Sequence, residues 1–284
     1  MAAPATEEKT FRAYTPSDAQ KYARYPGTAT FKLTETFKTT IGLDPSEGMI
    51  NAARSLMPKK TPNGPLVKFE VSTAEDISPE LIPDGSVDLL TAATCAHWFN
   101  FDLFYPSAAR ILAPNGTIAL FISSTSLHPD TPNADAINTA LRDIEAAELV
   151  QHFEPGNLLA HDLYATLPMP WTISPPEPAF PESLFRRKTF GMSEEEAEGQ
   201  IDGEGFYTVA AEFDLDTVEM MLATASPVTR WREANPEKAS TEEDIVRSMR
   251  RTMEKLLWEA GVDKGQELVR PGIAGVLLML KKRA

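Results

Sequence analysis

The sequence predicts an α/β fold in which short parallel strands alternate with crossover helices. Two strongly apolar stretches, 86–94 and 117–123, have the composition of strands buried on both faces. A shorter apolar run, 40–43, ends in the acid Asp44, and helical periodicity begins directly afterwards at Ser46. Strands and helices that alternate in this way favour a mostly parallel sheet, and such sheets bind ligands at the carboxyl ends of their strands.

The remaining elements follow from apolar periodicity and from capping and turn residues. We expect helices at 28–37, 46–57, 102–112 and 242–259, strands at 40–43, 67–72, 86–94, 117–123, 207–213 and 275–280, and a turn at 114–116.

These elements divide the chain into four parts. Residues 1–10 are expected to be disordered, and 11–123 carry the α/β core. Residues 124–206 contain many prolines with interspersed aromatics, which indicates an inserted, mainly helical cap over the ligand crevice. Residues 207–284 supply the strands and helices that complete the core.

Composition narrows the class of protein and its partners. The net charge of −14 argues against nucleic acid and against an anionic membrane as a partner. No run of 18 apolar residues is present, and the N-terminus lacks the basic start and apolar core of a signal peptide. The single cysteine, Cys95, excludes an internal disulfide and fits a reducing compartment. We therefore expect a cytoplasmic protein that acts on a small molecule, with an oligomeric state that the sequence leaves open.

Five motifs occur in an order and at a spacing that are typical of one family. They are IGLDPSEGMI (41–50), STAED (72–76), SVDLLT (86–91) leading into AHWF (96–99), LAPNGT (112–117) and RWREANP (230–236). With these motifs the chain resembles the class I S-adenosylmethionine-dependent methyltransferases, and among them the trans-aconitate methyltransferase-like group of small-molecule enzymes. The resemblance implies a Rossmann-like, mostly parallel sheet and S-adenosylmethionine as cofactor.

The resemblance also implies a cofactor role for several residues. Asp44 would accept hydrogen bonds from both ribose hydroxyls. Glu75 and Asp76 would face the adenine, with a carboxylate receiving its exocyclic amine. Trp98 would lie beside the sulfonium, which its electron-rich face suits. Gly27 is what remains of the family's glycine loop at its tail.

His97, Arg230 and Trp231 are the candidates for catalysis and substrate binding. His97 would be the general base if the methyl acceptor is a hydroxyl, whereas transfer to a carboxylate needs only in-line placement. Arg230 and Trp231 would clamp a carboxylate substrate. The three remaining histidines share no metal-ligand spacing with cysteines or acids, so we predict no metal site.

Each of these residues also has a purely structural interpretation. Asp44 would interact with the dipole of the following helix, and Glu75 and Asp76 would be surface acids. His97 and Trp98 would be core residues. The segment that begins at Arg230 would pack its arginine stems against the neighbouring tryptophan.

The chain departs from the family pattern near its N-terminus. Tyr-Ala-Arg-Tyr (22–25) directly abuts Pro-Gly-Thr-Ala-Thr (26–30), where the family has a helix, its first strand and the start of the glycine loop between them. A piece of about 30 residues, the size of the core of a βαβ unit, is therefore expected to be absent. The sheet would close up, another segment or chain would replace the strand, or the sequence would be an altered-splicing product that folds poorly.

Three functions follow from these alternatives. The first is methyl transfer to an oxygen of a small organic metabolite, including a secondary metabolite. The second is a degenerate, accessory protein that does not bind the cofactor and instead binds a pathway intermediate or a partner enzyme. The third is a product without function.

Overall fold

The computed structural model describes residue 30 and residues 33–56, 67–191 and 212–284. The predicted disordered N-terminus, Gly27 and most of the predicted strand at 207–213 lie outside the described residues, and the predicted helix at 28–37 lies only partly inside them. The helices are α3 (Glu47–Leu56), α4 (Phe101–Ile111), α5 (Ala134–Ile144), α6 (Pro155–His161), α7 (Leu215–Leu222), α8 (Ser226–Ala234) and α9 (Ile245–Glu259). The strands are β1 (Ile41–Asp44), β2 (Lys68–Val71), β3 (Val87–Ala93), β4 (Leu112–Leu127), β5 (Arg186–Phe190), β6 (Phe213–Asp214), β7 (Leu268–Val269) and β8 (Pro271–Lys281).

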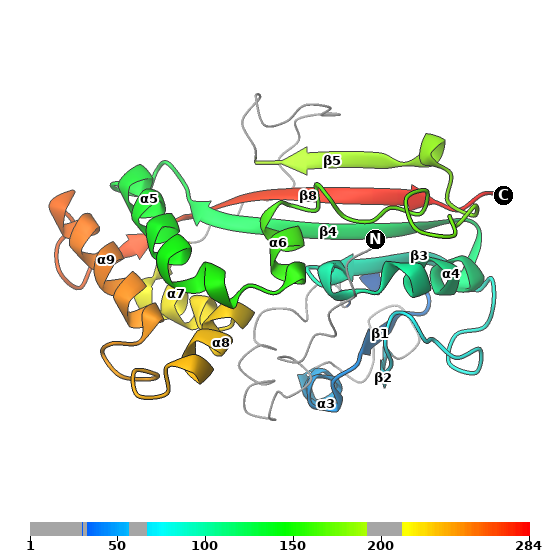
Figure 1. Ribbon diagram of the computed structural model, residues 1–284, viewed down its shortest axis with the longest axis horizontal. Coiled ribbons are helices and arrows are strands. Elements are labelled where there is room, and N and C mark those ends of the chain that lie inside the picture. Colours follow the sequence, from blue (N-terminus) through cyan, green and yellow to red (C-terminus); the bar gives the residue numbers. More distant parts are fainter. Residues whose placement is uncertain (1–29, 31–32, 57–66, 192–211) are drawn as a thin grey trace. The chain divides into compact units, whose positions relative to one another are not determined.

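The strands form three sheets in the described part of the chain. Strands β3, β4, β8 and β5 lie side by side in that order, β1 pairs with β2 in parallel, and β6 pairs with β7 in antiparallel (Figure 1). The α/β class with a Rossmann-like sheet is therefore confirmed. Strand β5 was not predicted: it lies inside the expected cap, 124–206, and it joins the four-stranded sheet as its edge strand.

The chain divides into two compact units. One unit contains residues 1–120, 168–185 and 279–284, and the other contains 121–167 and 186–278. The first unit includes β1, β2, β3, α3 and α4, which carry the predicted cofactor residues. The second includes α5 to α9, which pack around buried apolar side chains of their own.

Most predicted element boundaries agree with the structure to within three residues, and one element is wrong. The predicted turn at 114–116 lies inside β4, because Asn115 adopts a left-handed conformation (φ 66°) without ending the strand. The amide of Lys282 donates to the carbonyl oxygen of Gly116 at 2.8 Å, so the pairing partner continues past this point. A Cβ at Gly116 would lie 2.9 Å from the carbonyl oxygen of Ala113 and 3.0 Å from that of Val87, so glycine permits this close approach.

Helix α9 begins at Ile245, three residues later than its apolar pattern predicts. The reason is Asp244, whose carboxylate accepts the amide of Val246 at 3.0 Å and caps the helix. Asp244 is 1% exposed and forms a two-point ion pair with Arg232, which makes this cap a fixed point.

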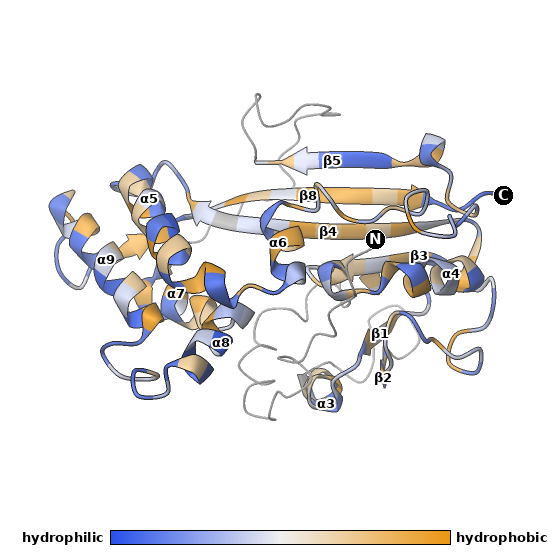
Figure 2. Cartoon of the chain, in the orientation of Figure 1, coloured by the Kyte–Doolittle hydropathy of each residue, from blue (hydrophilic) through white to orange (hydrophobic). Residues whose placement is uncertain are grey.

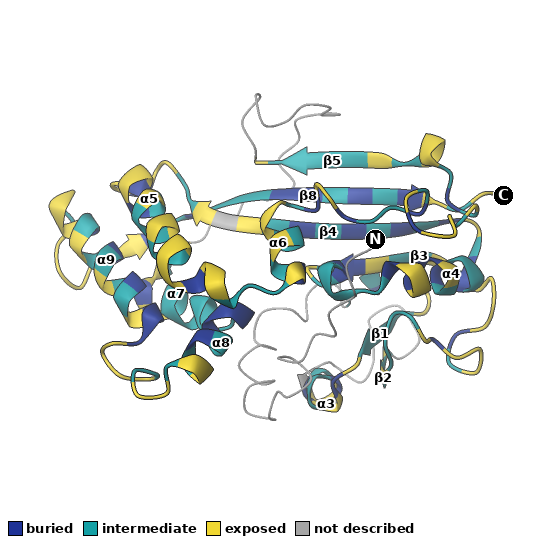
Figure 3. Cartoon of the chain, in the orientation of Figure 1, coloured by how far each residue is buried: buried dark blue, intermediate teal, exposed yellow. Residues whose placement is uncertain are grey.

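The β1–β2 pair differs from the four-stranded sheet in its burial. Every residue of β1 is half-buried and the two end residues of β2 are exposed, whereas β4 and β8 are rich in apolar residues and contain many buried ones (Figures 2 and 3). Ile41 and Leu43 of β1, like Val87 and Leu90 of β3, pack against one buried cluster that includes Ile111 of α4. In the described part of the chain, side chains rather than a backbone ladder therefore join β1 to β3.

Helix α4 fixes the loop that follows β3. Its buried Phe101, Phe104 and Tyr105 form a chain of ring contacts with centroids 5.3–6.0 Å apart. The Tyr105 hydroxyl donates to the carbonyl oxygen of Pro168 at 2.8 Å, and the Tyr105 ring lies 6.3 Å from that of Phe180. These contacts hold α4 near its start, where the loop that contains His97 and Trp98 leads into it.

Among the described residues, no helix has the length and apolarity required to cross a membrane.

Candidate functional site

The predicted cofactor residues that the structure describes come from the carboxyl ends of three strands. Asp44 is the last residue of β1, Glu75 and Asp76 follow β2, and His97 and Trp98 form a short 3-10 helix, η2 (Ala96–Trp98), after β3. All of them belong to the same compact unit. Gly27 lies outside the described residues, so its role in the glycine loop stays a prediction.

Asp44 has one contact that stabilises the helix behind it. Its Oδ1 accepts the amide of Ser46 at 2.8 Å, and the Ser46 hydroxyl in turn accepts the amide of Met49 at 3.3 Å. These bonds satisfy amides at the start of α3, where helices leave donors without partners. The capping interpretation and the ribose interpretation of Asp44 are compatible, because a carboxylate has several acceptor positions.

The two acids after β2 have different surroundings. Glu75 is half-buried, and its Oε1 accepts the amide of Asn100 at 2.8 Å. Asp76 is exposed, and its backbone is held by Ser72 and Thr73: the Asp76 amide donates to the Thr73 hydroxyl, and the Ser72 hydroxyl donates to the Asp76 carbonyl oxygen, each at 3.2 Å. Asp76 therefore presents a carboxylate from a fixed loop, while Glu75 already has a partner.

Cys95 directly precedes η2, and the pKa of its thiol is raised. Burial is the largest cause that raises the pKa of its thiol to about 12, and the carboxylates of Asp44 and Glu75 contribute to the same shift. These negative charges act on the thiol because they lie near it. Cys95 is therefore a protonated thiol at neutral pH and not an activated nucleophile.

The imidazole of His97 is neutral at physiological pH. Burial lowers its pKa to about 4, and its ring lies 4.8 Å from that of Trp98 at an interplanar angle of 56°. A base is most effective when its pKa lies near the working pH, so His97 is available in the right form but accepts a proton weakly. This favours hydrogen bonding and orientation over strong general-base catalysis.

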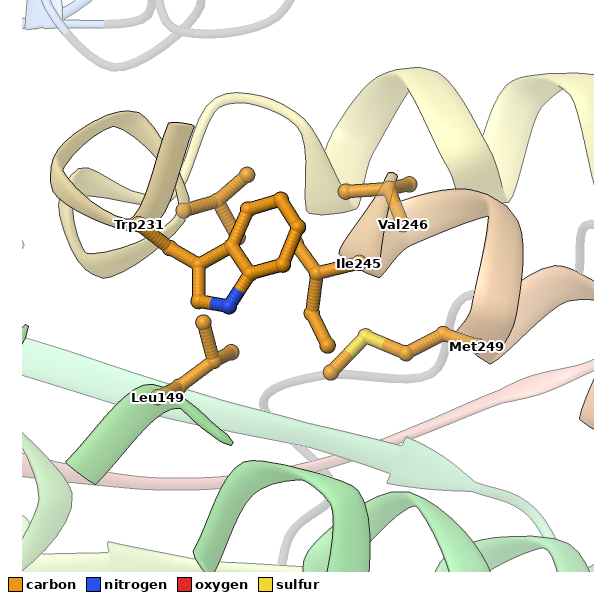
Figure 4. Close-up of a cluster of buried hydrophobic side chains, with 6 residues drawn as sticks. Leu149, Trp231, Ile245, Val246 and Met249 are labelled. Atoms are coloured by element: carbon orange, nitrogen blue, oxygen red, sulfur yellow. The ribbon is translucent and has the colours of Figure 1, made fainter. Parts of the chain in front are cut away.

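Arg230 and Trp231, the predicted substrate residues, lie in the second compact unit on α8. The Arg230 guanidinium donates to the carbonyl oxygen of His152 at 2.7 Å and lies 3.5 Å from the Glu154 carboxylate. Figure 4 shows Trp231 packed among buried apolar side chains, and it is 3% exposed. Its indole nitrogen donates to Glu148 at 3.4 Å. These contacts give both residues a structural role, and their substrate role stays a prediction.

Two features of this structure did not emerge from the sequence. The Glu75–Asn100 hydrogen bond joins residues 25 apart, and only the Asn-Phe-Asp start of α4 signals that a helix end is near. A hollow of about 400 Å³ in the second unit is lined by residues that include Asp143, Lys238 and Trp231. No local pattern reveals it, because its lining comes from separate helices.

No cluster of potential metal ligands occurs within the described residues.

The donor and acceptor groups fit the nucleoside half of S-adenosylmethionine. Asp44 and Asp76 offer acceptors where the cofactor has hydroxyl and amine donors, and Trp98 offers an aromatic face. The chain region expected to meet the methionine half includes Gly27, outside the described residues.

Comparison with known proteins gives consistent matches. Residues 25–120 match the family described as a methyltransferase domain. A Dictyostelium discoideum protein named as a methyltransferase is 44% identical over 110 residues, which are 39% of this chain and 37% of that protein. The Saccharomyces cerevisiae protein CRG1, named as an S-adenosylmethionine-dependent methyltransferase, is 32% identical over 111 residues, 38% of this chain and 36% of its own. The chain thus spans little more than a third of the length of these relatives.

A solved structure shares the fold over most of the chain. The protein comes from Anaeromyxobacter dehalogenans and is named as a type II methyltransferase, with 22% identity, a TM-score of 0.54, and coverage of 90% of this chain and 85% of that one. At this identity the likeness concerns the fold alone. Residues 25–120 therefore match a methyltransferase domain, and most of the chain shares the fold of a solved methyltransferase.

Proposed function

We propose that the protein transfers a methyl group from S-adenosylmethionine to an oxygen of a small organic molecule. One observation carries this proposal: β1 and β2 pair in parallel and Glu75 bonds to Asn100 after β3, so Asp44, Glu75 and the loop with His97 all lie at the carboxyl ends of strands. Ligands bind α/β sheets at such strand ends. The domain match over residues 25–120 supports the choice of cofactor.

The roles of the residues follow from their chemistry. When bound, the cofactor supplies an electrophilic methyl group on a sulfonium; the acceptor oxygen forms the new bond to carbon while the sulfur keeps the electron pair of the broken one. Asp44 accepts the ribose hydroxyls, Asp76 accepts the adenine amine, and Trp98 faces the positive sulfur. His97 orients the acceptor with a neutral ring, which suits an oxygen that needs little or no deprotonation.

Within the family we place the chain in the trans-aconitate methyltransferase-like group, acting on a metabolite in the cytoplasm. Its acidity supports a small-molecule substrate over nucleic acid. We also propose that the family's first strand is lacking. The separation of β1–β2 from β3 in the described part of the chain supports this, because that strand would lie between them.

Calorimetric titration with S-adenosylhomocysteine, the demethylated product, tests the proposal. We expect micromolar affinity, which corresponds to about −8 kcal/mol. Asp44→Asn keeps an acceptor for the Ser46 amide but removes the charge, and should weaken binding about tenfold to a hundredfold. Asp88→Asn, on an exposed residue of β3, is the matched control and should bind normally. If folded protein gives no heat at millimolar ligand, the transferase is refuted and an accessory role takes its place.

A further inference from the structure

The Glu75 carboxylate bonds to the neighbouring loop. Its Oε1 accepts the amide of Asn100 at 2.8 Å, and Asn100 is the residue directly before α4. A hydrogen bond to an ionised acceptor is about twice as strong as a neutral one. The bond therefore joins the loop after β2 to the loop after β3.

The position of this bond at a helix start adds to its strength. The Asn100 side chain makes no capping hydrogen bond to α4, while its carbonyl oxygen accepts the amides of Leu103 and Phe104 at 3.1 and 2.8 Å. The N-terminal end of a helix carries a partial positive charge and unpaired amides, and both attract a carboxylate. Glu75 thus supplies, from a distant loop, a second negative group near this helix start, where Asp102 already lies in the first turn.

The loop between β3 and α4 is thereby fixed at both of its ends. At the β3 end, the Trp98 amide donates to the Cys95 carbonyl oxygen at 3.0 Å, and the Phe99 amide donates to that of Ala96 at 3.0 Å. At the α4 end, Glu75 holds Asn100. His97 and Trp98 lie between these two anchors, so their placement depends on the Glu75 carboxylate.

The neighbouring acid offers a contrast. Asp76 is exposed, and among the described residues its carboxylate has no hydrogen-bond or ion-pair partner. The two adjacent acids therefore have separate tasks, one free to meet a ligand and one committed to the protein.

We propose that Glu75 is a positioning residue that links the adenine side of the site, at 73–76, to the His97–Trp98 loop and keeps that loop in place for methyl transfer. The link between the loops stands on the structure alone, and its catalytic meaning rests on the proposed function. A ligand held by residues 73–76 would stabilise the Glu75–Asn100 hydrogen bond and, through it, the loop that faces the acceptor.

Amide hydrogen exchange of the full-length protein, read residue by residue by NMR, tests the link without any ligand. In Glu75→Ala the Asn100 amide should exchange about tenfold faster or more, because a charge-assisted hydrogen bond is lost. Glu75→Gln keeps an oxygen acceptor and should restore most of the protection. Glu75→Asp keeps the charge but is one methylene short, so it should resemble the alanine variant.

Asp76→Asn is the matched control and should leave the Asn100 amide unchanged. Unchanged exchange at Asn100 in both Glu75→Ala and Glu75→Asp would overturn the link. If the alanine variant does not fold, the aspartate and glutamine variants decide the question alone, since they differ in reach and in charge.

Addition of S-adenosylhomocysteine tests the coupling. In the wild type the ligand should slow exchange at Asn100, whereas in Glu75→Ala it should bind without slowing that amide. Asp76→Asn should weaken binding and keep the coupling. Equal slowing in the wild type and in Glu75→Ala would refute the positioning role. If the ligand binds to no variant, the proposed function fails while the ligand-free exchange still decides the link.

Discussion

The two halves of the candidate site rest on strands with very different support. Asp44, the proposed ribose acid, ends β1, whose residues are all half-buried and which, among the described residues, pairs with β2 alone, a strand of four residues. His97 and Trp98 follow β3, which belongs to a four-stranded sheet whose next strand, β4, contains the fully buried Leu112, Ile118 and Leu120. The half of the site that follows β3 is therefore supported by a larger and more buried sheet than the half that contains Asp44.

The difference has a simple physical origin. An isolated pair of short strands is at best marginally stable in water, and needs packing against other elements. For β1 that packing comes from Ile41 and Leu43, which lie against the buried cluster shared with β3 and α4. Such contacts are non-directional, so they hold β1 near β3 without fixing its register as a backbone ladder would.

The largest expected effect comes from truncating a side chain in the buried apolar cluster against which β1 packs. Ile111 is 1% exposed and lies in the cluster with Ile41 and Leu43, so Ile111→Ala should lower the free energy of unfolding by about 2–5 kcal/mol. The loss should be concentrated in β1 and β2, whose amides should exchange faster than those of β4. Hydrogen exchange with chemical denaturation measures both quantities.

Ile118→Ala in β4 is the matched control, because Ile118 is equally buried but lies in the four-stranded sheet. It should cost a similar free energy and affect the sheet as a whole. If both variants speed amide exchange in β1 and β2 to the same degree, the two halves of the site unfold together, and the inferred difference in their stability is wrong.

A smaller effect on the free energy of unfolding should come from the protonation of His97, which lies in the half of the site that follows β3. Burial lowers its pKa from 6.5 to about 4, so between these pH values the unfolded chain binds the proton and the folded chain does not. Stability should therefore rise with pH across this window, by at most about 3 kcal/mol. Urea denaturation from pH 4 to 7 measures the slope.

His97→Gln should flatten that slope between pH 4 and 6.5 while leaving the acid loss below pH 4. The acid loss includes Asp244, whose pKa is lowered by its hydrogen bonds to Arg232, Ser240 and Val246 despite the opposing effect of burial. An unchanged slope in His97→Gln would show that the imidazole is not held neutral by the fold.

The sequence predicted the fold class and most elements because apolar periodicity and capping residues act locally. It failed at 114–116, where Pro-Asn-Gly is a normal turn signal. There Asn115 and Gly116 accommodate an irregular strand that pairs with the C-terminal segment, and a tertiary partner overrides the local preference. Strand β5 was missed because charged and polar residues, Arg186 to Thr189, make up most of it, as is common for an edge strand.

The sequence predicted which strands the candidate residues follow, but not the contacts that these residues make. The order of strands and acids placed Asp44, Glu75 and His97 at one edge of the fold. It did not separate the tasks of Glu75 and Asp76, because the partner of Glu75 is a backbone amide 25 residues away. Nor did it predict the low pKa of His97, which arises from burial by residues distant in the sequence.

The smallest expected effect tests directly whether the end of β1 lies near the end of β3. Cys95 follows β3 and is the single cysteine of the chain, so a thiol reagent reports on this one position. Burial raises its pKa to about 12, and the negative charge of Asp44 at the end of β1 adds to the shift. Asp44→Asn should therefore lower the pKa of Cys95 and speed its alkylation by iodoacetamide at a fixed pH near 9, because only the thiolate reacts.

Asp88→Asn provides the control for this measurement. It removes an equal charge from an exposed position on β3 itself and should leave the alkylation rate unchanged, so a general change in net charge cannot account for the effect. An Asp44→Asn rate equal to that of the wild type would place Asp44 too far from Cys95 to act on it. The carboxyl ends of β1 and β3 would then not meet, and a single ligand could not be held by both halves.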